Sequence, residues 1–315
     1  MGVQPGGWRL LSIRIGCFRL ETCDLRLVTC NWQQVPCTNI FSCIEYPSMH
    51  TKNEYPLIDI GANLSHESFS GDLDQIIDEA QQVGIQHIMV TGTSIADSSK
   101  AASLATHYEG YLSSTAGVHP HEAASFNECM PKDLKALALQ DCVKAIGETG
   151  LDYFRDYSPR EDQKAALAQQ LQLAVDLQMP VFLHQREGHE DFMQILREYR
   201  NSLPRGVVHC FTGTQAELCD YLELDMHIGI TGWICDERRG HHLHEFIHLI
   251  PENRLMLETD APYLLPRTIR PKPPSRRNVP ANLVHVLATV AQCLGKSEKN
   301  IAELTTTNAR DFFAL

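Results

Sequence analysis

The sequence of this 315-residue chain predicts an α/β fold, a parallel (β/α)8 barrel of the TIM type. From residue 56 onward, short apolar runs rich in β-branched residues alternate with amphipathic stretches that have helical spacing. Eight strand–helix units follow one another in this way. Strict alternation is typical of a parallel sheet, and eight units suit a closed barrel. A doubly wound open sheet is the rival, weakened because no Gly-rich phosphate loop follows the first strand.

Each strand is expected from a short apolar run, and each helix from apolar residues three or four positions apart. Strands are expected at residues 57–63, 87–93, 112–119, 142–148, 181–185, 206–211, 227–231 and 254–260. Helices are expected at residues 72–83, 95–108, 131–139, 160–177, 189–199, 215–222, 242–249 and 281–293. A last helix at 297–313 closes the chain.

Residues 1–50 differ from the rest of the chain in composition and in hydrophobic pattern. They contain five of the eleven Cys residues and show no lasting helical or strand period. Arginines interrupt every apolar stretch, which argues against a secretory signal, and several acidic residues argue against a transit peptide. We expect a disordered extension outside the fold at 1–50 and one hydrolase barrel at 51–315. The extension is either upstream sequence translated from a start before Met49 or a regulatory tail.

Composition narrows the function classes. A net charge of −12 and a pI of about 5.6 argue against a protein that coats nucleic acid or binds membrane surfaces. No segment approaches the roughly 20 apolar residues of a membrane span. The Cys residues are odd in number and form no CxxC pair, so we expect a reducing, cytoplasmic compartment.

Four apolar runs each end in a side chain that can bind a metal ion. These residues are Glu148, His184, His209 and Asp260. The carboxyl ends of the strands in a parallel barrel meet at one face, where such barrels hold their active sites. Two imidazoles and two carboxylates suit a divalent cation; oxygen ligands favour magnesium or manganese, and imidazole shifts the preference toward manganese, zinc or iron. Alone, His209 could be a core histidine and Asp260 a turn cap, but four such residues at equivalent positions indicate a site.

Other polar side chains follow the same strand ends. His119 and His121 end the third strand and could bind the metal, orient a phosphate or donate a proton to the leaving group, or lie in a loop. Arg186 follows His184, and Trp233 follows the seventh strand, where an aromatic ring could stack on a base or simply pack.

A basic, proline-rich segment follows Asp260. Residues 267–277 hold five basic side chains, among them Arg276 and Arg277, and no acid. Prolines keep such a segment out of helix. In an acidic protein, a basic loop beside a cation site points to an anionic substrate, the alternative being a solvated loop.

Together these residues resemble the TatD family of metal-dependent deoxyribonucleases, within the amidohydrolase-like barrel superfamily. The resemblance covers roughly residues 55–315. The matching strings are Ala-Gly-Val-His119-Pro-His121, Ala-Ile-Gly-Glu148-Thr-Gly-Leu-Asp152, Pro-Val-Phe-Leu-His184, Val-His209-Cys-Phe-Thr-Gly, Ile-Gly-Ile-Thr-Gly-Trp233 and Glu258-Thr-Asp260-Ala-Pro-Tyr-Leu. The resemblance implies that Glu148, His184 and His209 bind metal and that Asp260 is a ligand or the base.

One departure concerns the first strand. Much of the family opens with an Asp-x-His-x-His string that supplies two metal ligands, whereas this chain has Gly61 and Asn63 in the histidine places. Glycine has no side chain to bind with, and asparagine offers only a neutral amide oxygen. The chain is thus more similar to the branch named TatD proper, and we expect one tightly held ion rather than two.

The resemblance implies phosphodiester hydrolysis by metal-activated water, with Mg²⁺ as the ion and Mn²⁺ as the alternative. The expected activity is that of a 3′-5′ exonuclease on single-stranded DNA, and on RNA, in DNA repair or degradation. Asp260, Glu148, His119 and His121 would take part in catalysis, and Arg186, Trp233, Arg276 and Arg277 would bind the substrate. Two alternatives stay open: an ester or amide hydrolase such as an aminoacyl-tRNA deacylase, and a non-catalytic barrel with a decayed metal site.

Overall fold

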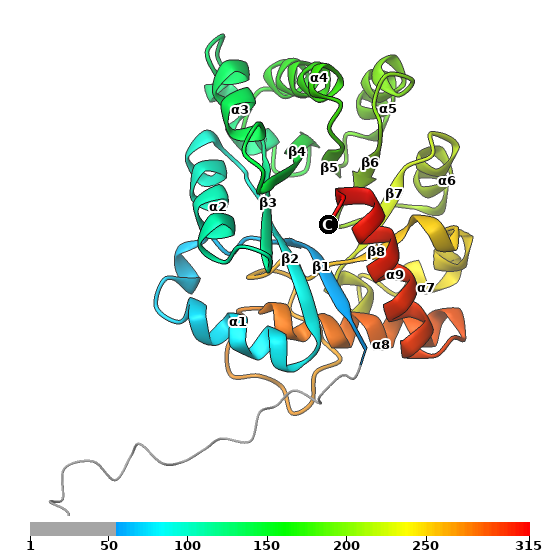
Figure 1. Cartoon of the computed structure of the whole chain (residues 1–315). Helices are drawn as coiled ribbons and strands as arrows, with labels where there is room; N and C mark the ends of the chain where they lie inside the picture. The colour runs from blue at the N-terminus through cyan, green and yellow to red at the C-terminus, as the bar shows by residue number, and fades with distance from the viewer. Residues whose placement is uncertain (1–54) are drawn as a thin grey trace, which may run out of the picture. The chain divides into compact units, whose positions relative to one another are not determined.

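The computed structural model of this chain describes residues 55–315, and the expectations for residues 1–50 lie outside the described part. Eight strands form one sheet, each strand pairing in parallel with the next along the chain. A parallel bridge between Ala62 and Ala261 joins the two edges of the sheet. The helices surround the strands, as Figure 1 shows. The predicted α/β barrel is confirmed.

The helices and strands alternate along the chain as expected. The strands are β1 (Leu57–Ala62), β2 (Ile85–Val90), β3 (Leu112–Ala116), β4 (Val143–Asp152), β5 (Val181–Arg186), β6 (Gly206–Val208), β7 (His227–Ile230) and β8 (Leu255–Leu257). The helices are α1 (Leu73–Gln82), α2 (Ile95–His107), α3 (Met130–Ala138), α4 (Arg160–Leu177), α5 (His189–Tyr199), α6 (Gln215–Glu223), α7 (Leu243–Phe246), α8 (Leu283–Leu294) and α9 (Glu298–Phe313). No helix within residues 55–315 is long and apolar enough to cross a membrane.

Some boundaries differ from the sequence expectation, and two of the differences lie at the site. Strand β3 ends at Ala116 rather than at His119, because Pro120 begins a 3-10 turn that the His119 side chain caps. Strand β4 continues past Glu148 to Asp152 and so carries two candidate site carboxylates. The helix expected at 242–249 is shorter: α7 has four residues and a 3-10 turn, Ile247–Leu249, follows it.

The core has an inner and an outer part. Alternate residues of β1 point to opposite faces, so Ile58 and Ile60 lie inside the barrel while Leu57 packs toward the helices. Phe182 and Met256 fill the same interior, and both are fully buried. The barrel is therefore a packed core rather than a pore, and a site can form only at an end.

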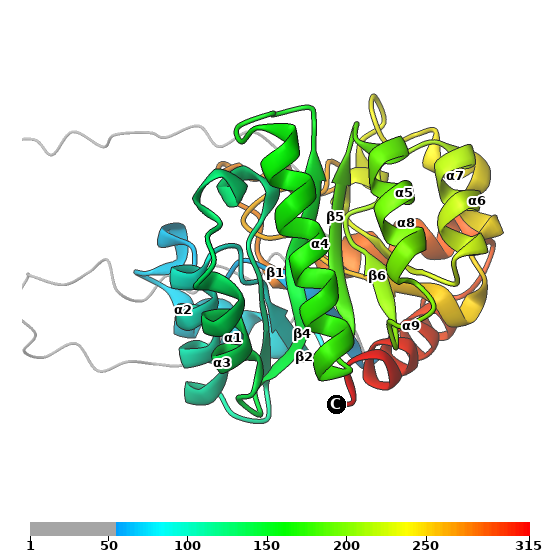
Figure 2. The same cartoon turned by 90° about the horizontal axis from the view of Figure 1, so that it is seen from above.

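Helix α9 covers the seam where β8 meets β1. Its Thr306 hydroxyl donates to the Pro56 carbonyl at 2.8 Å, and its Asn308 amide donates to the Leu255 carbonyl at 2.8 Å. Both carbonyls lie at the starts of these strands, which leaves the carboxyl ends of the strands free at the opposite end of the barrel. Figure 2 shows the outer helices standing beside the strands, with α4 and α5 on either side of β5 in this view.

Two glycines let β4 and β5 approach closely around Glu148. A Cβ atom at Gly147 would lie 2.1 Å from the Phe182 carbonyl oxygen, and one at Gly150 would lie 1.7 Å from the His184 carbonyl oxygen. Both glycines have positive φ, 136° and 158°. No other residue fits these positions, since a side chain would collide with backbone. The glycines around Glu148 thus hold its carboxylate beside the end of β5.

Candidate metal centre

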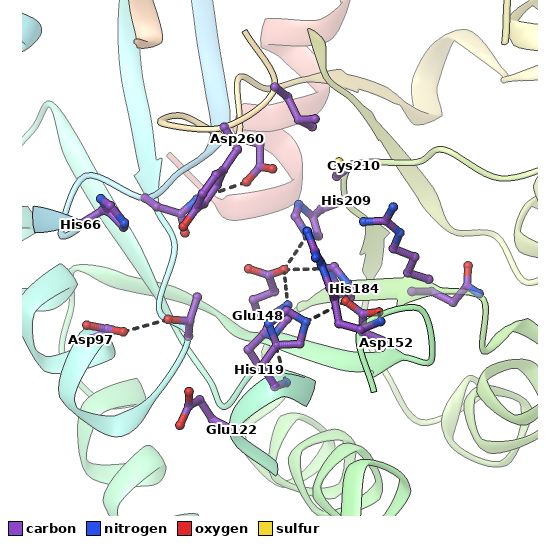
Figure 3. Close-up of a pocket in the computed structure, with 18 of the residues that line it drawn as sticks. His66, Asp97, His119, Glu122, Glu148, Asp152, His184, His209, Cys210 and Asp260 are labelled. Carbon is purple, nitrogen blue, oxygen red and sulfur yellow. Dashed lines mark hydrogen bonds and ion pairs between the residues drawn. The ribbon is translucent and has the colours of Figure 1, made fainter. Parts of the chain in front are cut away.

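A cavity of about 870 Å³ opens at the carboxyl ends of the strands. Residues from the ends of β3, β4, β5, β6 and β8 line it, and Figure 3 shows how their side chains point toward one another. The lining includes His119, Glu148, His184, His209 and Asp260. The structure therefore brings the strand-end residues to one place.

The Glu148 carboxylate lies at the centre of this group. Its Oε1 atom is 2.8 Å from His184 Nδ1, 2.8 Å from His209 Nε2 and 3.3 Å from His119 Nε2. His184 Nδ1 and His209 Nε2 are 3.3 Å apart. One carboxylate oxygen thus faces three imidazole nitrogens, and three of these four residues (His119, Glu148 and His184) have donor atoms all within 4.8 Å of one another.

These separations suit the ligands of one divalent cation. Adjacent ligand atoms around Mg²⁺, each bound at about 2.1 Å in octahedral geometry, lie about 3.0 Å apart. The contacts of Glu148 span 2.8–3.3 Å. The donor set is one carboxylate with imidazoles, which manganese and zinc accept more readily than magnesium does. The residues present therefore fit a cation, and His119 joins the set that the sequence had assigned to Glu148, His184, His209 and Asp260.

The protonation states reflect the same crowding. Burial opposes charge on Glu148. His209 and His119 nevertheless stabilise its negative charge and hold its pKa well below the ordinary value. Burial also opposes charge on His209, yet Glu148 and Glu258 raise its pKa well above the usual range. In contrast, burial lowers the pKa of His119 to about 4. His119 is therefore neutral near pH 7, and at this pH protons hardly compete with a cation for its ring nitrogen.

Two further carboxylates lie behind the histidines. Asp152 Oδ2 is 2.7 Å from His121 Nε2 and 3.6 Å from His184 Nε2. Glu258 Oε2 is 3.5 Å from His209 Nδ1. Neither carboxylate contacts Glu148, so both act on the group through the far nitrogen of a ring.

Asp260 lines the same cavity, but no hydrogen bond or ion pair joins it to Glu148 or the three histidines within residues 55–315, so its role as a metal ligand stays a prediction. Its Oδ1 accepts from the Asn63 amide at 3.1 Å, and its backbone has a positive φ of 53°. Burial raises the pKa of Asp260 to about 7, although His209 opposes the rise. The amide of Asn63 thus orients this carboxylate.

Two of the expected substrate contacts lie at the cavity. The guanidinium of Arg186 stacks on the Phe154 ring at 3.8 Å from the ring centre, and both residues line the cavity. Trp233 also lines it, with the Arg239 guanidinium 4.3 Å above its ring. The mouth of the cavity thus combines positively charged side chains with aromatic faces.

The other two expected substrate contacts are not among the residues that line the cavity. Arg277 forms an ion pair with Asp72 at 2.5 Å and donates to the Ser68 carbonyl at 2.6 Å, which holds it against the start of α1. Arg276 is exposed. For both arginines, substrate binding stays a prediction.

Several cavity residues were not found from the sequence. Phe154 and Tyr263 are 49 % and 52 % exposed, unusual for large aromatic side chains, and each follows a site carboxylate by two or three positions. That spacing was a usable signal. Glu258, which faces His209 and is not among the residues that line the cavity, gave no signal by itself, because its neighbours in space are distant in sequence.

A family model described as TatD related DNase matches residues 58–314. This chain belongs to the TatD family. Relatives named 3′-5′ ssDNA/RNA exonuclease TatD include one from Erwinia billingiae (strain Eb661), 49 % identical over 259 residues that cover 82 % of this chain and 99 % of the relative. Another, from Klebsiella pneumoniae (strain 342), is 45 % identical with coverage of 82 % and 98 %.

Solved structures of the TatD family show the same barrel. A TatD family hydrolase from Entamoeba histolytica superposes with a TM-score of 0.75 at 28 % identity, covering 84 % of this chain and 99 % of that one. The TatD homologue YJJV from Escherichia coli K12 has a TM-score of 0.75 at 28 % identity, with coverage of 82 % and 98 %. The family assignment therefore spans the described barrel and not the first residues of the chain.

Proposed function

We propose that this TatD family member is a cation-dependent nuclease that removes nucleotides from the 3′ end of single-stranded DNA and RNA. The observation that carries the proposal is the convergence of His119, His184 and His209 on one oxygen of Glu148 inside the cavity. The relatives named for this activity match over nearly their whole length, which supports the same reaction here.

The cation is a single divalent ion, magnesium or manganese, held by Glu148, His184, His209 and His119. When bound, it would neutralise charge on a phosphate oxygen and lower the pKa of a water molecule beside it. The three imidazoles make manganese the better fit of the two. One ion is proposed rather than two, because Gly61 and Asn63 replace the first-strand histidines.

The protein's own side chains divide the remaining work. Asp260 is oriented by the Asn63 amide and accepts the proton of the attacking water. His121, held by Asp152 at 2.7 Å and part-exposed at the mouth, donates to the leaving oxygen. Arg186 pairs with a backbone phosphate while its guanidinium stays stacked on Phe154.

The mouth of the cavity favours a nucleic-acid strand. Phe154 and Tyr263 expose their rings on the parts of the mouth built by the segments after β4 and β8, and single-stranded bases stack on such rings. Arg155, Arg186 and Arg239 add positive charge around them. Hydrolysis of an amide or acyl ester is not favoured, because the lining offers cations and aromatic faces rather than an aliphatic acyl pocket. A role in DNA repair or degradation, in the cytoplasm, goes with this proposal.

The test uses the full chain stripped of metal. A 5′-labelled single-stranded oligonucleotide is incubated with Mg²⁺ or Mn²⁺, beside a 3′-labelled copy and a His209→Ala control. The proposal expects a cation-dependent ladder shortening from the 3′ end, absent from the control. Intact DNA and RNA in the presence of bound cation would contradict the nuclease assignment and turn attention to acyl esters.

A further inference from the structure

Glu258, just after β8, is a buried carboxylate that the proposed reaction does not use. Its side chain is completely buried. One oxygen, Oε1, accepts the backbone N–H of Cys210, whereas Oε2 has no hydrogen bond among the described residues. A polar oxygen that is buried without a hydrogen-bond partner is unfavourable. Some favourable interaction must therefore offset the cost of burying this carboxylate.

The barrel makes room for this carboxylate on two sides. A Cβ atom at Gly61 on β1 would lie 2.5 Å from Oε2, and one at Gly229 on β7 would lie 2.5 Å from Oε1. Real Cβ atoms do not approach an oxygen so closely. Two strands far apart in the sequence thus lack side chains at the points that face Glu258. Gly61 is also the position at which the chain departs from the two-histidine string.

The group nearest to the open oxygen is His209. Oε2 of Glu258 lies 3.5 Å from His209 Nδ1, which has no hydrogen bond either. The other ring nitrogen, Nε2, lies 2.8 Å from Glu148. Phe182 packs on the ring, with centroids 4.7 Å apart. His209 is therefore clamped between the carboxylate of the cation group and a second carboxylate outside it.

The opposite histidine is arranged in the same way. His184 turns Nδ1 toward Glu148 at 2.8 Å and Nε2 toward Asp152 at 3.6 Å. Asp152 is only 2 % exposed, but it also pairs with His121. Because Asp152 serves two rings and Glu258 faces only one, Glu258 offers the cleaner test.

We propose that Glu258 is a positioning residue: its carboxylate accepts the Nδ1–H of His209 and so fixes the tautomer that turns the Nε2 lone pair toward the cation. A carboxylate on the far nitrogen of a ligating imidazole orients the ring and makes it a stronger ligand. This inference rests on the proposed cation site. The competing explanation is that Glu258 only holds the backbone turn at Cys210.

The Glu258→Gln variant separates these explanations because it keeps the shape. A glutamine has one acceptor oxygen, which the Cys210 N–H occupies, and it then presents its NH₂ group to Nδ1 of His209. That contact favours the wrong tautomer, with the proton on Nε2. At alkaline pH, where protons no longer compete for His209, we expect the affinity for Mn²⁺ to fall about 10- to 100-fold. The variant also breaks a buried pair between Glu258 and His209, so the melting temperature of the cation-free protein should fall.

Asp59→Asn is the matched control. Asp59 is an equally buried carboxylate, on β1, but it bonds to Thr259 and to the Gly61 N–H and contacts no imidazole. The same change from acid to amide should leave the Mn²⁺ affinity within about threefold of the wild type. A general effect of removing a buried charge from the barrel would instead lower both affinities together.

The measurements are Mn²⁺ titration calorimetry on the three proteins and ¹⁵N NMR of His209 in the Mg²⁺-saturated wild type, assigned with His209→Ala. The inference expects a protonated Nδ1 and selective weakening in Glu258→Gln. An Nε2–H tautomer in the wild type, or unchanged affinity in Glu258→Gln, would overturn it. The NMR measurement does not depend on Glu258→Gln. The inference can therefore still be refuted if that variant does not fold. Cation binding without cleavage of DNA would instead contradict only the nuclease proposal.

Discussion

Raising the pH from about 6 to about 8 should strengthen cation binding steeply, because a cation competes with protons for the imidazoles. Burial opposes charge on His184 and His209 in the cation-free centre. Even so, Asp152 and Glu148 raise the pKa of His184, and Glu148 and Glu258 raise the pKa of His209 well above its usual range. Both rings must therefore lose a proton before they can bind.

The magnitude follows from the number of protons displaced. Each proton released contributes about a factor of ten in apparent affinity per pH unit, or about 1.4 kcal/mol. Two rings then give a rise of about 100-fold per pH unit, which levels off once the pH passes their pKa values in the folded protein. His119 adds little to the slope at neutral pH, because burial lowers its pKa to about 4.

The same shifts have the opposite sign for the cation-free fold. A histidine whose pKa is raised by folding stabilises the protein fully below its unfolded pKa, and this stabilisation is lost as the pH rises through the folded value. The contributions of His184 and His209 to the stability of the cation-free protein therefore fade at alkaline pH, while the cation is held more tightly.

Titration calorimetry of Mn²⁺ at several pH values, in two buffers of different ionisation enthalpy, measures both the affinity and the protons released. A Glu148→Gln control should show a smaller pH slope, because this carboxylate raises the pKa of both rings. An affinity that does not vary with pH, with no proton release in the wild type, would refute the reasoning.

Three other changes test separate parts of the account. Glu148→Ala removes the oxygen shared by the three imidazoles, so cleavage should fall at least about 10²-fold without loss of the far-ultraviolet circular dichroism of the fold; full activity would remove Glu148 from the site. Phe182→Ala empties a fully buried position in the barrel interior and should lower the free energy of unfolding by about 3–5 kcal/mol in urea titrations, whereas a change below about 1 kcal/mol would mean that the interior collapses around the gap. Phe154→Ala should raise KM for single-stranded DNA by about tenfold, because stacking on this ring contributes about 1–3 kcal/mol. Hydrolysis of a small aryl phosphodiester, which has no base to stack, should be unchanged. Equal effects on both substrates would argue against a base-stacking role.

The barrel and most of its site could be predicted because their signals are local. An apolar run that ends in His184 or Glu148 shows its strand and its functional side chain within a few residues, and the parallel barrel then brings the strand ends together. The overrun of β4 to Asp152 was harder to see, because glycines on both sides of Glu148 are typical of a strand end, whereas here they allow close contact with β5.

What could not be predicted depends on contacts between distant residues. Arg277 belongs by sequence to a basic loop, yet it pairs with Asp72, 205 positions earlier. The role proposed for Glu258 depends on its contacts with Gly61, Gly229 and His209, which lie on or beside three other strands. A single sequence gives no sign of which acid will meet which ring once the barrel closes.

The most direct measurement follows bound Mn²⁺ by electron paramagnetic resonance while exonuclease rates are recorded on the same metal-free samples. For the wild type, the rate should rise in proportion to bound ion and reach its plateau at one ion per chain, whereas Glu148→Ala should show neither binding nor cleavage at the same concentrations. Cleavage that persists in Glu148→Ala, or a plateau reached with no ion bound, would contradict the claim that the histidines around Glu148 hold the ion that cleaves nucleic acid.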